Sequence, residues 1–151
     1  MDRFVSGHRL RRLALFSPAS ETLSPWIHYT GLRAGTQTAY YHGDDVAKLS
    51  EYAWHTQGTR TSQPAGQKLP NELGLYDMLG NVWEIASDLF EIWKTDEPKV
   101  DPSGPVEGST RVLRGGCSYN KWDQNRCAMR HPISATYADP AIGMRLLCEI
   151  D

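Results

Sequence analysis

Glycine and proline interrupt the chain along its whole length and limit how long any helix or strand can be. Thirteen glycines and nine prolines are spread over 151 residues, and five Trp and seven Tyr stand among them. Proline breaks helix interiors, and glycine favours turns. We therefore expect one irregular, loop-rich domain held together by buried aromatic side chains, and not a helix bundle.

Charge and hydropathy exclude several classes of protein. Sixteen basic and eighteen acidic residues give a net charge of −2, which argues against nucleic-acid binding through a broad positive field. No apolar run approaches the roughly 18–20 residues of a membrane-spanning helix, and the apolar stretch 13–16 is shorter than the roughly 7–15 residues of a signal-peptide core. Three cysteines are too few, and odd in number, for a disulfide-stapled secreted scaffold. We expect a cytoplasmic protein that binds neither nucleic acid nor membrane.

The character of the sequence changes near residue 30. Residues 1–30 lack clear periodicity beyond a short helical turn at 9–16. Residues 44–54 predict one or two helical turns, and 56–72 a long polar loop. Residues 73–93 form the best-ordered candidate, because apolar residues recur there near a spacing of three to four.

Acidic and basic residues occupy different parts of the chain. Residues 72–101 hold eight acidic side chains and two lysines, whereas 111–145 hold five arginines and one lysine against two aspartates. The two regions could pair internally as solvated faces. Alternatively, the acidic part holds a cation and the basic part presents an anion- or peptide-binding surface.

Four motifs follow one another in a specific order: Gly74–Glu84 (GLYDMLGNVWE), Asp101–Pro105 (DPSGP), Arg111–Gly116 (RVLRGG) and Ile142–Arg145 (IGMR). In order and spacing they resemble the formylglycine-generating enzyme (sulfatase-modifying factor) family, over roughly the C-terminal half of a full family domain. The resemblance implies an α+β, C-type-lectin-like fold with short strands, few helices and much irregular chain. It divides the sequence into a divergent N-terminal segment, 1–30, and a partial family domain, 31–151.

The first of these motifs is chemically suited to a metal ion. Asp77 and Glu84 are carboxylates seven positions apart, and Gly80 between them allows a tight turn. Calcium takes about 6–8 oxygen ligands from carboxylates and backbone carbonyls. The resemblance implies calcium binding through the side chains of Asp77 and Glu84 and the backbone carbonyls of Gly80 and Val82. In the alternative interpretation, Asp77 caps a turn and Glu84 pairs with an arginine.

The residues for the family's redox chemistry are incomplete. Its aerobic enzymes oxidise a substrate cysteine to formylglycine, with Cu(I) held by two cysteines four residues apart, and soft thiolates suit this soft ion. Here Cys117 follows Gly116 and the next cysteine is Cys127, so we expect no Cu(I) site. The resemblance places Cys117 and Trp83 in the active-site region and gives Cys127 a structural role. An ordinary packed thiol and a core tryptophan are the alternatives for the first two.

Two functions of different classes are compatible with these motifs. The first is an oxidase related to formylglycine-generating enzymes. The second is a non-catalytic module that binds a peptide or protein ligand, as in retroelement-diversified relatives, and its adaptable side chains would be Tyr119, Asn120, Trp122, Asp123, Asn125 and Tyr137. A third possibility is a decayed gene product that folds poorly. The missing cysteine pair favours binding or a lost activity.

Overall fold

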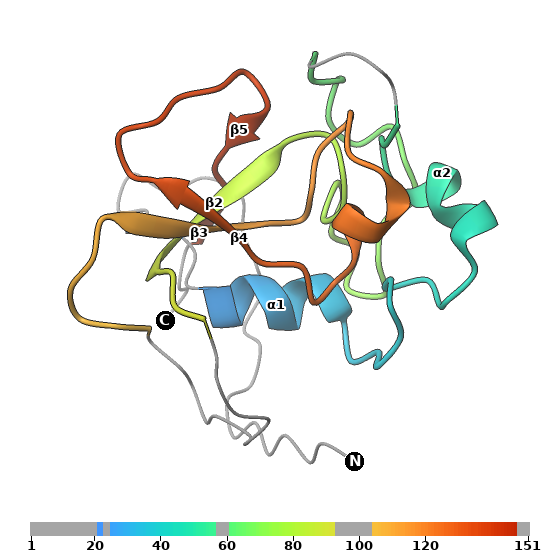
Figure 1. The fold of residues 1–151 in the computed structure, drawn as a ribbon. Helices are drawn as coiled ribbons and strands as arrows, with labels where there is room; N and C mark the ends of the chain where they lie inside the picture. Colours follow the sequence, from blue (N-terminus) through green and yellow to red (C-terminus); the bar gives the residue numbers. More distant parts are fainter. Residues whose placement is uncertain (1–20, 23–24, 57–60, 93–103, 148–151) are drawn as a thin grey trace.

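The computed structural model describes residues 21–22, 25–56, 61–92 and 104–147, and Figure 1 shows their arrangement. The elements follow one another as β1 (Glu21–Thr22), α1 (Pro25–Arg33), η1 (Val46–Lys48), α2 (Leu49–Tyr52), β2 (Trp83–Leu89), β3 (Thr110–Arg114), η2 (Trp122–Asn125), β4 (His131–Ser134), β5 (Ile142–Gly143) and β6 (Leu146–Leu147). All are short and are joined by long irregular segments. This confirms the loop-rich domain expected from the distribution of glycine and proline, and the α+β class that the resemblance implies.

A small mixed sheet forms the centre of the described domain. Its strand order is β4-β3-β2-β5, in which β2–β3 and β3–β4 are antiparallel and β2–β5 is parallel. A register irregularity separates the pairs formed by Ile85 and Leu89 with β3, which is the position of a β-bulge in β2. The terminal strands β1 and β6 pair separately and antiparallel.

Helix α1 lies beside the sheet and contacts β2 and β3 (Figure 1). It begins at Pro25, whose fixed φ and missing N–H suit the first helical position. Successive side chains of a strand point to opposite faces. Glu84 therefore reaches His28 of α1, while its neighbour Trp83 packs with Leu113 and Cys117 on the other face. Strand β2 is covered on both sides, which explains why its first two residues are both buried.

Two clusters of buried side chains hold the irregular chain together. One gathers Leu32, Tyr40, Tyr41, Leu49, Ala53, Met78, Leu79 and Cys127. The other gathers Trp83, Leu113, Cys117 and Ala141. Aromatic side chains anchor both, as the sequence predicted.

The described part of residues 73–93, the best-ordered candidate in the sequence, consists of turns followed by a strand. The three-to-four spacing of apolar residues does not form a helix, because 74–82 is a series of turns and β2 begins at Trp83. Met78 and Leu79 are nevertheless buried, since the turns press them into the first cluster. Helical turns at 44–54 are confirmed by η1 and α2, whereas the turn predicted at 9–16 lies outside the described residues.

Candidate functional site

The segment 76–84, which the sequence predicts to bind calcium, is a sharply folded turn anchored to two other segments. Asp77, Gly80 and Asn81 all have positive φ, of 53°, 74° and 61°. The Gly80 N–H donates to the Gly115 carbonyl at 2.9 Å, and the Asn81 N–H donates to the Trp54 carbonyl at 3.0 Å. The turn is therefore fixed by backbone contacts with residues far away in sequence.

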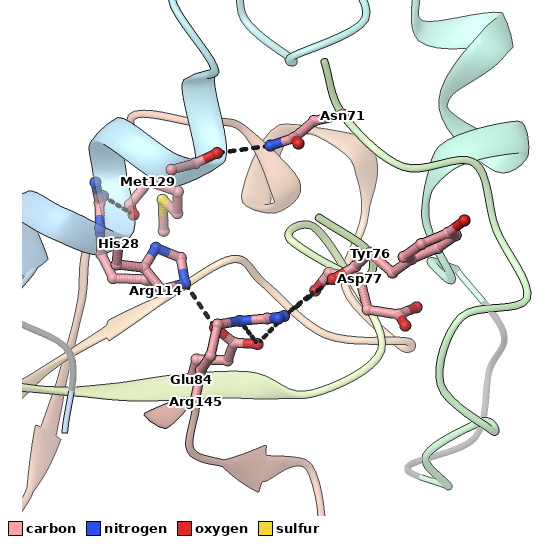
Figure 2. Close-up of polar contacts among 9 residues, drawn as sticks. His28, Asn71, Tyr76, Asp77, Glu84, Arg114, Met129 and Arg145 are labelled. Atoms are coloured by element: carbon pink, nitrogen blue, oxygen red, sulfur yellow. Dashed lines mark hydrogen bonds and ion pairs between the residues drawn. The ribbon is translucent and has the colours of Figure 1, made fainter. Parts of the chain in front are cut away.

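Glu84, at the C-terminal end of this turn, is a buried carboxylate with two basic partners. Arg145 Nε lies 3.0 Å from each carboxylate oxygen, and Arg145 Nη2 lies 2.6 Å from Oε1. His28 Nε2 lies 2.7 Å from Oε2. Figure 2 shows these side chains converging from α1, from β2 and from the segment after β5. Both oxygens of Glu84 are thus engaged within the protein.

Burial and pairing set the charges of this group. Burial on its own raises the pKa of Glu84, but the hydrogen bond from His28 and the Arg145 guanidinium outweigh it, so the pKa lies below the usual 4.5. Burial lowers the pKa of His28 below 6.5 despite the carboxylate beside it. At neutral pH Glu84 is therefore ionised and His28 is neutral, and the Nε2–H of His28 donates to Glu84.

Arg145 also binds the start of the turn. Its Nη2 lies 3.1 Å from the Tyr76 carbonyl oxygen and 3.2 Å from that of Asp77 (Figure 2). One guanidinium therefore faces two backbone carbonyls and one carboxylate. The alternative pairing of Glu84 with an arginine is confirmed, and it also joins the acidic and basic parts of the sequence.

The two carboxylates predicted to hold calcium do not face a common point in this arrangement. The Asp77 carboxylate points away from Glu84 (Figure 2), and its Oδ2 accepts the Gly66 N–H at 2.7 Å. Its Oδ1 is buried without a hydrogen-bond partner among the described residues. No group of three or more His, Cys, Asp or Glu side chains able to hold a metal ion occurs in the described part of the chain. Calcium binding through Asp77, Gly80, Val82 and Glu84 stays a prediction.

The two described cysteines lie in different core clusters. Cys117 packs with Trp83, and Cys127 packs with Leu32 and Met78. Burial raises the pKa of both thiols, that of Cys127 to about 12. The Cys117 Sγ donates to Asn120 Oδ1 at 2.8 Å. Both thiols are therefore protonated and serve packing, and neither is presented to a substrate.

Trp83 is a core residue, as the sequence predicted. Only 5% of its surface is exposed, and its ring stacks on the exposed His131 with 5.5 Å between the ring centroids. Gly115 and Gly116 lie where the backbone comes very close to other segments. A Cβ on Gly115 would stand 3.1 Å from the Met78 carbonyl oxygen, and one on Gly116 would overlap Asn125.

The proposed binding surface is only partly a surface. Asn120 and Asn125 are buried, so in this structure their side chains do not face solvent, and a ligand contact through them stays a prediction. Asn125 Nδ2 instead donates to the carbonyls of Asn120 and Lys121, and Asn120 Oδ1 accepts the Cys117 N–H at 3.0 Å. These amides supply hydrogen bonds to segment 117–121, which lies outside the regular elements.

The remaining candidates differ in exposure. Tyr119 is half-buried against the second core cluster. Trp122 and Asp123 in η2 are exposed, and so is Tyr137 in the turn after β4, with half of the Trp122 and Tyr137 surfaces open to solvent. Three of the six side chains are thus available to a ligand without rearrangement.

Sequence reasoning missed His28 as a partner of Glu84. It lies 56 positions away and in the segment that was set apart as divergent. Helix α1 runs through residue 30, so the polar network crosses the boundary drawn between 1–30 and 31–151. The second partner, Arg145, could have been found from the sequence, because it belongs to the IGMR motif and an arginine can pair with an acidic side chain.

Comparisons with known proteins identify what the chain is similar to. The family described as "Sulfatase-modifying factor enzyme 1-like domain" matches residues 28–150. The serine/threonine-protein kinase pkn1 of Chlamydia pneumoniae is 43% identical over 81 residues, which are 50% of this chain and 13% of that protein. The formylglycine-generating enzyme of Streptomyces coelicolor is 35% identical over 98 residues, 62% of this chain and 31% of that enzyme.

A solved structure shares the fold. The Treponema denticola variable protein 1 superposes with a TM-score of 0.78 and 30% identity, covering 85% of this chain and 47% of that one. The chain therefore spans a third or less of the two curated relatives named above and about half of this structural relative. Because the family match extends over most of the sequence, the chain belongs to the sulfatase-modifying factor (formylglycine-generating enzyme) family.

Proposed function

We propose that this domain binds a peptide or protein ligand and does not make formylglycine by a copper route. The observation that carries the proposal is the separation of the two described thiols, Cys117 and Cys127, into two core clusters with raised pKa values. Copper chemistry of the family's kind needs two thiolates that share one soft ion. Two protonated, buried thiols in separate clusters do not supply them.

The diversity of the relatives supports a binding role. The same domain is matched in proteins named as protein kinases, as formylglycine-generating enzymes and as a variable protein. Membership of the family therefore does not fix an activity. In the kinase the match covers 13% of the protein, which favours a module used beside other domains.

The exposed side chains Trp122, Asp123 and Tyr137 supply the contacts in this proposal. Large aromatic side chains provide contact area at a low entropic cost, and they are typical of adaptable recognition surfaces. The Asn125 amide donates to the carbonyls of Asn120 and Lys121, and the Asn120 amide donates to Gln124 Oε1, so hydrogen bonds at both ends hold the η2 backbone that carries Trp122.

A cytoplasmic location is part of the same proposal. Cys117 and Cys127 are free thiols in the described structure, and unpaired buried cysteines are typical of reducing compartments. In the described residues, the structure contains no helix long and apolar enough to cross a membrane.

Mass spectrometry of a C-x-P-x-R peptide tests the absence of catalysis. The purified chain is incubated with the peptide under oxygen, with and without Cu(I), and the oxidation of the peptide thiol to an aldehyde is measured. We expect no conversion in either condition. Conversion by the wild-type chain that is lost in Cys117→Ser would refute this part of the proposal.

Selection from a displayed random-peptide library tests the binding role. Peptides enriched on the immobilised wild-type chain should bind more weakly to Trp122→Ser and Tyr137→Ser, and equally well to Lys121→Ser, an exposed neighbour used as the control. Because the substituted side chains are exposed, all three variants should keep the wild-type thermal stability. Enrichment that is insensitive to both aromatic substitutions would place the binding surface elsewhere.

A further inference from the structure

The cluster of oxygens around Arg145 has the composition of a cation site. Its members are the Glu84 carboxylate and the backbone carbonyls of Tyr76 and Asp77, all within 2.6–3.2 Å of the Arg145 guanidinium nitrogens. Carboxylate and carbonyl oxygens are also the ligands that calcium prefers. In the described structure, the positively charged group among these oxygens is the Arg145 guanidinium.

We propose that the Arg145 guanidinium is the resident cation of the turn 76–84, so that this protein fixes the turn with its own side chain and not with a metal ion. The guanidinium is well suited to this position, because its planar set of N–H donors meets a carboxylate with two parallel hydrogen bonds and still reaches the carbonyls.

A calcium ion and Arg145 would compete for the Glu84 carboxylate. Calcium binds oxygens at about 2.3–2.6 Å, and a calcium ion at that distance from Glu84 would lie beside guanidinium nitrogens that are themselves 2.6–3.0 Å from the carboxylate. Two cations so close repel each other strongly in a buried site. Glu84 is 7% exposed, so water does little to screen them.

His28 completes the exclusion of a metal ion. Its Nε2–H donates to Glu84 Oε2 at 2.7 Å. This is the carboxylate oxygen to which Arg145 Nη2 does not donate, because Nη2 binds Oε1. The buried carboxylate of Glu84 in β2 therefore links His28 of α1 to Arg145 in the segment after β5. The same guanidinium also links that segment to the turn at 76–77. A metal ion would have to break at least one of these links to enter.

Thermal unfolding of wild type, Arg145→Ala and Arg145→Lys, each with millimolar calcium, with magnesium, or with a chelator, tests the proposal. We expect no calcium-dependent change in the melting temperature of wild type. Arg145→Ala should melt at a lower temperature in chelator and recover part of the loss with calcium, since a ligand that binds only the folded state stabilises it. Arg145→Lys keeps a cation beside Glu84, so it should lose stability without recovering it in calcium.

Terbium luminescence, excited through nearby Tyr76 and Trp83, gives a second readout that a purely structural arginine would not change. We expect a signal with Arg145→Ala that calcium displaces, and none with wild type. A calcium-dependent rise in the wild-type melting temperature overturns the proposal, and so does the absence of any calcium response in a folded Arg145→Ala. Should Arg145→Ala remain unfolded even in calcium, the wild type decides alone: terbium binding overturns the proposal, and its absence supports it.

Discussion

Replacing Gly80 by alanine should destabilise the protein much more than replacing Gly74, although both glycines have φ of +74°. Any L-residue in this left-handed conformation costs roughly 1–2 kcal/mol. A Cβ on Gly74 would meet nothing within 4 Å, so this strain is the whole expected effect there. A Cβ on Gly80 would stand 2.1 Å from the Trp54 carbonyl oxygen, where ordinary contact begins at 3.4 Å.

The chain at position 80 must therefore move by more than an ångström. Such a movement breaks the hydrogen bond from the Asn81 N–H to the Trp54 carbonyl, and it stretches the one from the Gly80 N–H to Gly115. Each buried polar group left without a partner costs about 1–3 kcal/mol. The broken bond leaves two such groups, the Asn81 N–H and the Trp54 carbonyl, so with the strain the loss for Gly80→Ala is about 3–8 kcal/mol. This is a large share of the roughly 5–15 kcal/mol that stabilises a typical domain.

Urea unfolding followed by tryptophan fluorescence measures both variants against wild type. Gly74→Ala should unfold cooperatively with a modest loss, and Gly80→Ala should lose most of its stability or fail to fold. If the two variants lose the same free energy of unfolding, the close approach of Gly80 to Trp54 does not stabilise the turn. The positive φ would then be the whole reason why position 80 favours glycine.

Three further predictions rest on burial. Trp83→Ala should lower the free energy of unfolding by about 3–5 kcal/mol in the same urea assay, because it removes a buried indole, and an unchanged midpoint would place the core elsewhere. As the pH is lowered, the free energy of unfolding should begin to decrease at about pH 6.5, because the unfolded chain protonates His28 more readily than the native one. It should decrease further below about pH 4.5, as the low native pKa of Glu84 is approached. A stability that stays constant from pH 7 to 4 would contradict the network. Cys117 and Cys127 should react with a thiol reagent orders of magnitude more slowly in the native state than in urea, and fast native labelling of either would disprove its packing role.

Much of the architecture could be read from the sequence because it depends on local chemistry. Positive φ favours glycine, and the glycines of the GLYDMLGN and RVLRGG motifs stand where the backbone turns or approaches another segment. The scattered prolines and glycines predicted short elements, and the aromatic content predicted a core built on Tyr and Trp side chains. The ordered motifs predicted the family, which the match over residues 28–150 confirms.

The spacing of apolar residues in 73–83 was misleading for a physical reason. A run of turns can bury side chains at intervals of three or four as well as a helix does, and periodicity alone does not separate the two. The positive φ values at 77, 80 and 81 decide for turns, since a right-handed helix cannot include them.

What Glu84 does was decided only by the tertiary structure. Its sequence position allows either a metal ion or an arginine as partner, and nothing local distinguishes them. His28 and Arg145 lie 56 and 61 positions away, and chain reversals through α1, β2 and β5 bring them onto one buried carboxylate. Likewise, only the tertiary structure decided that Trp122 is exposed whereas Asn125, three residues later, is buried. A sequence determines which groups can form a hydrogen bond or an ion pair, but burial and partner choice depend on contacts between segments that are distant along the chain.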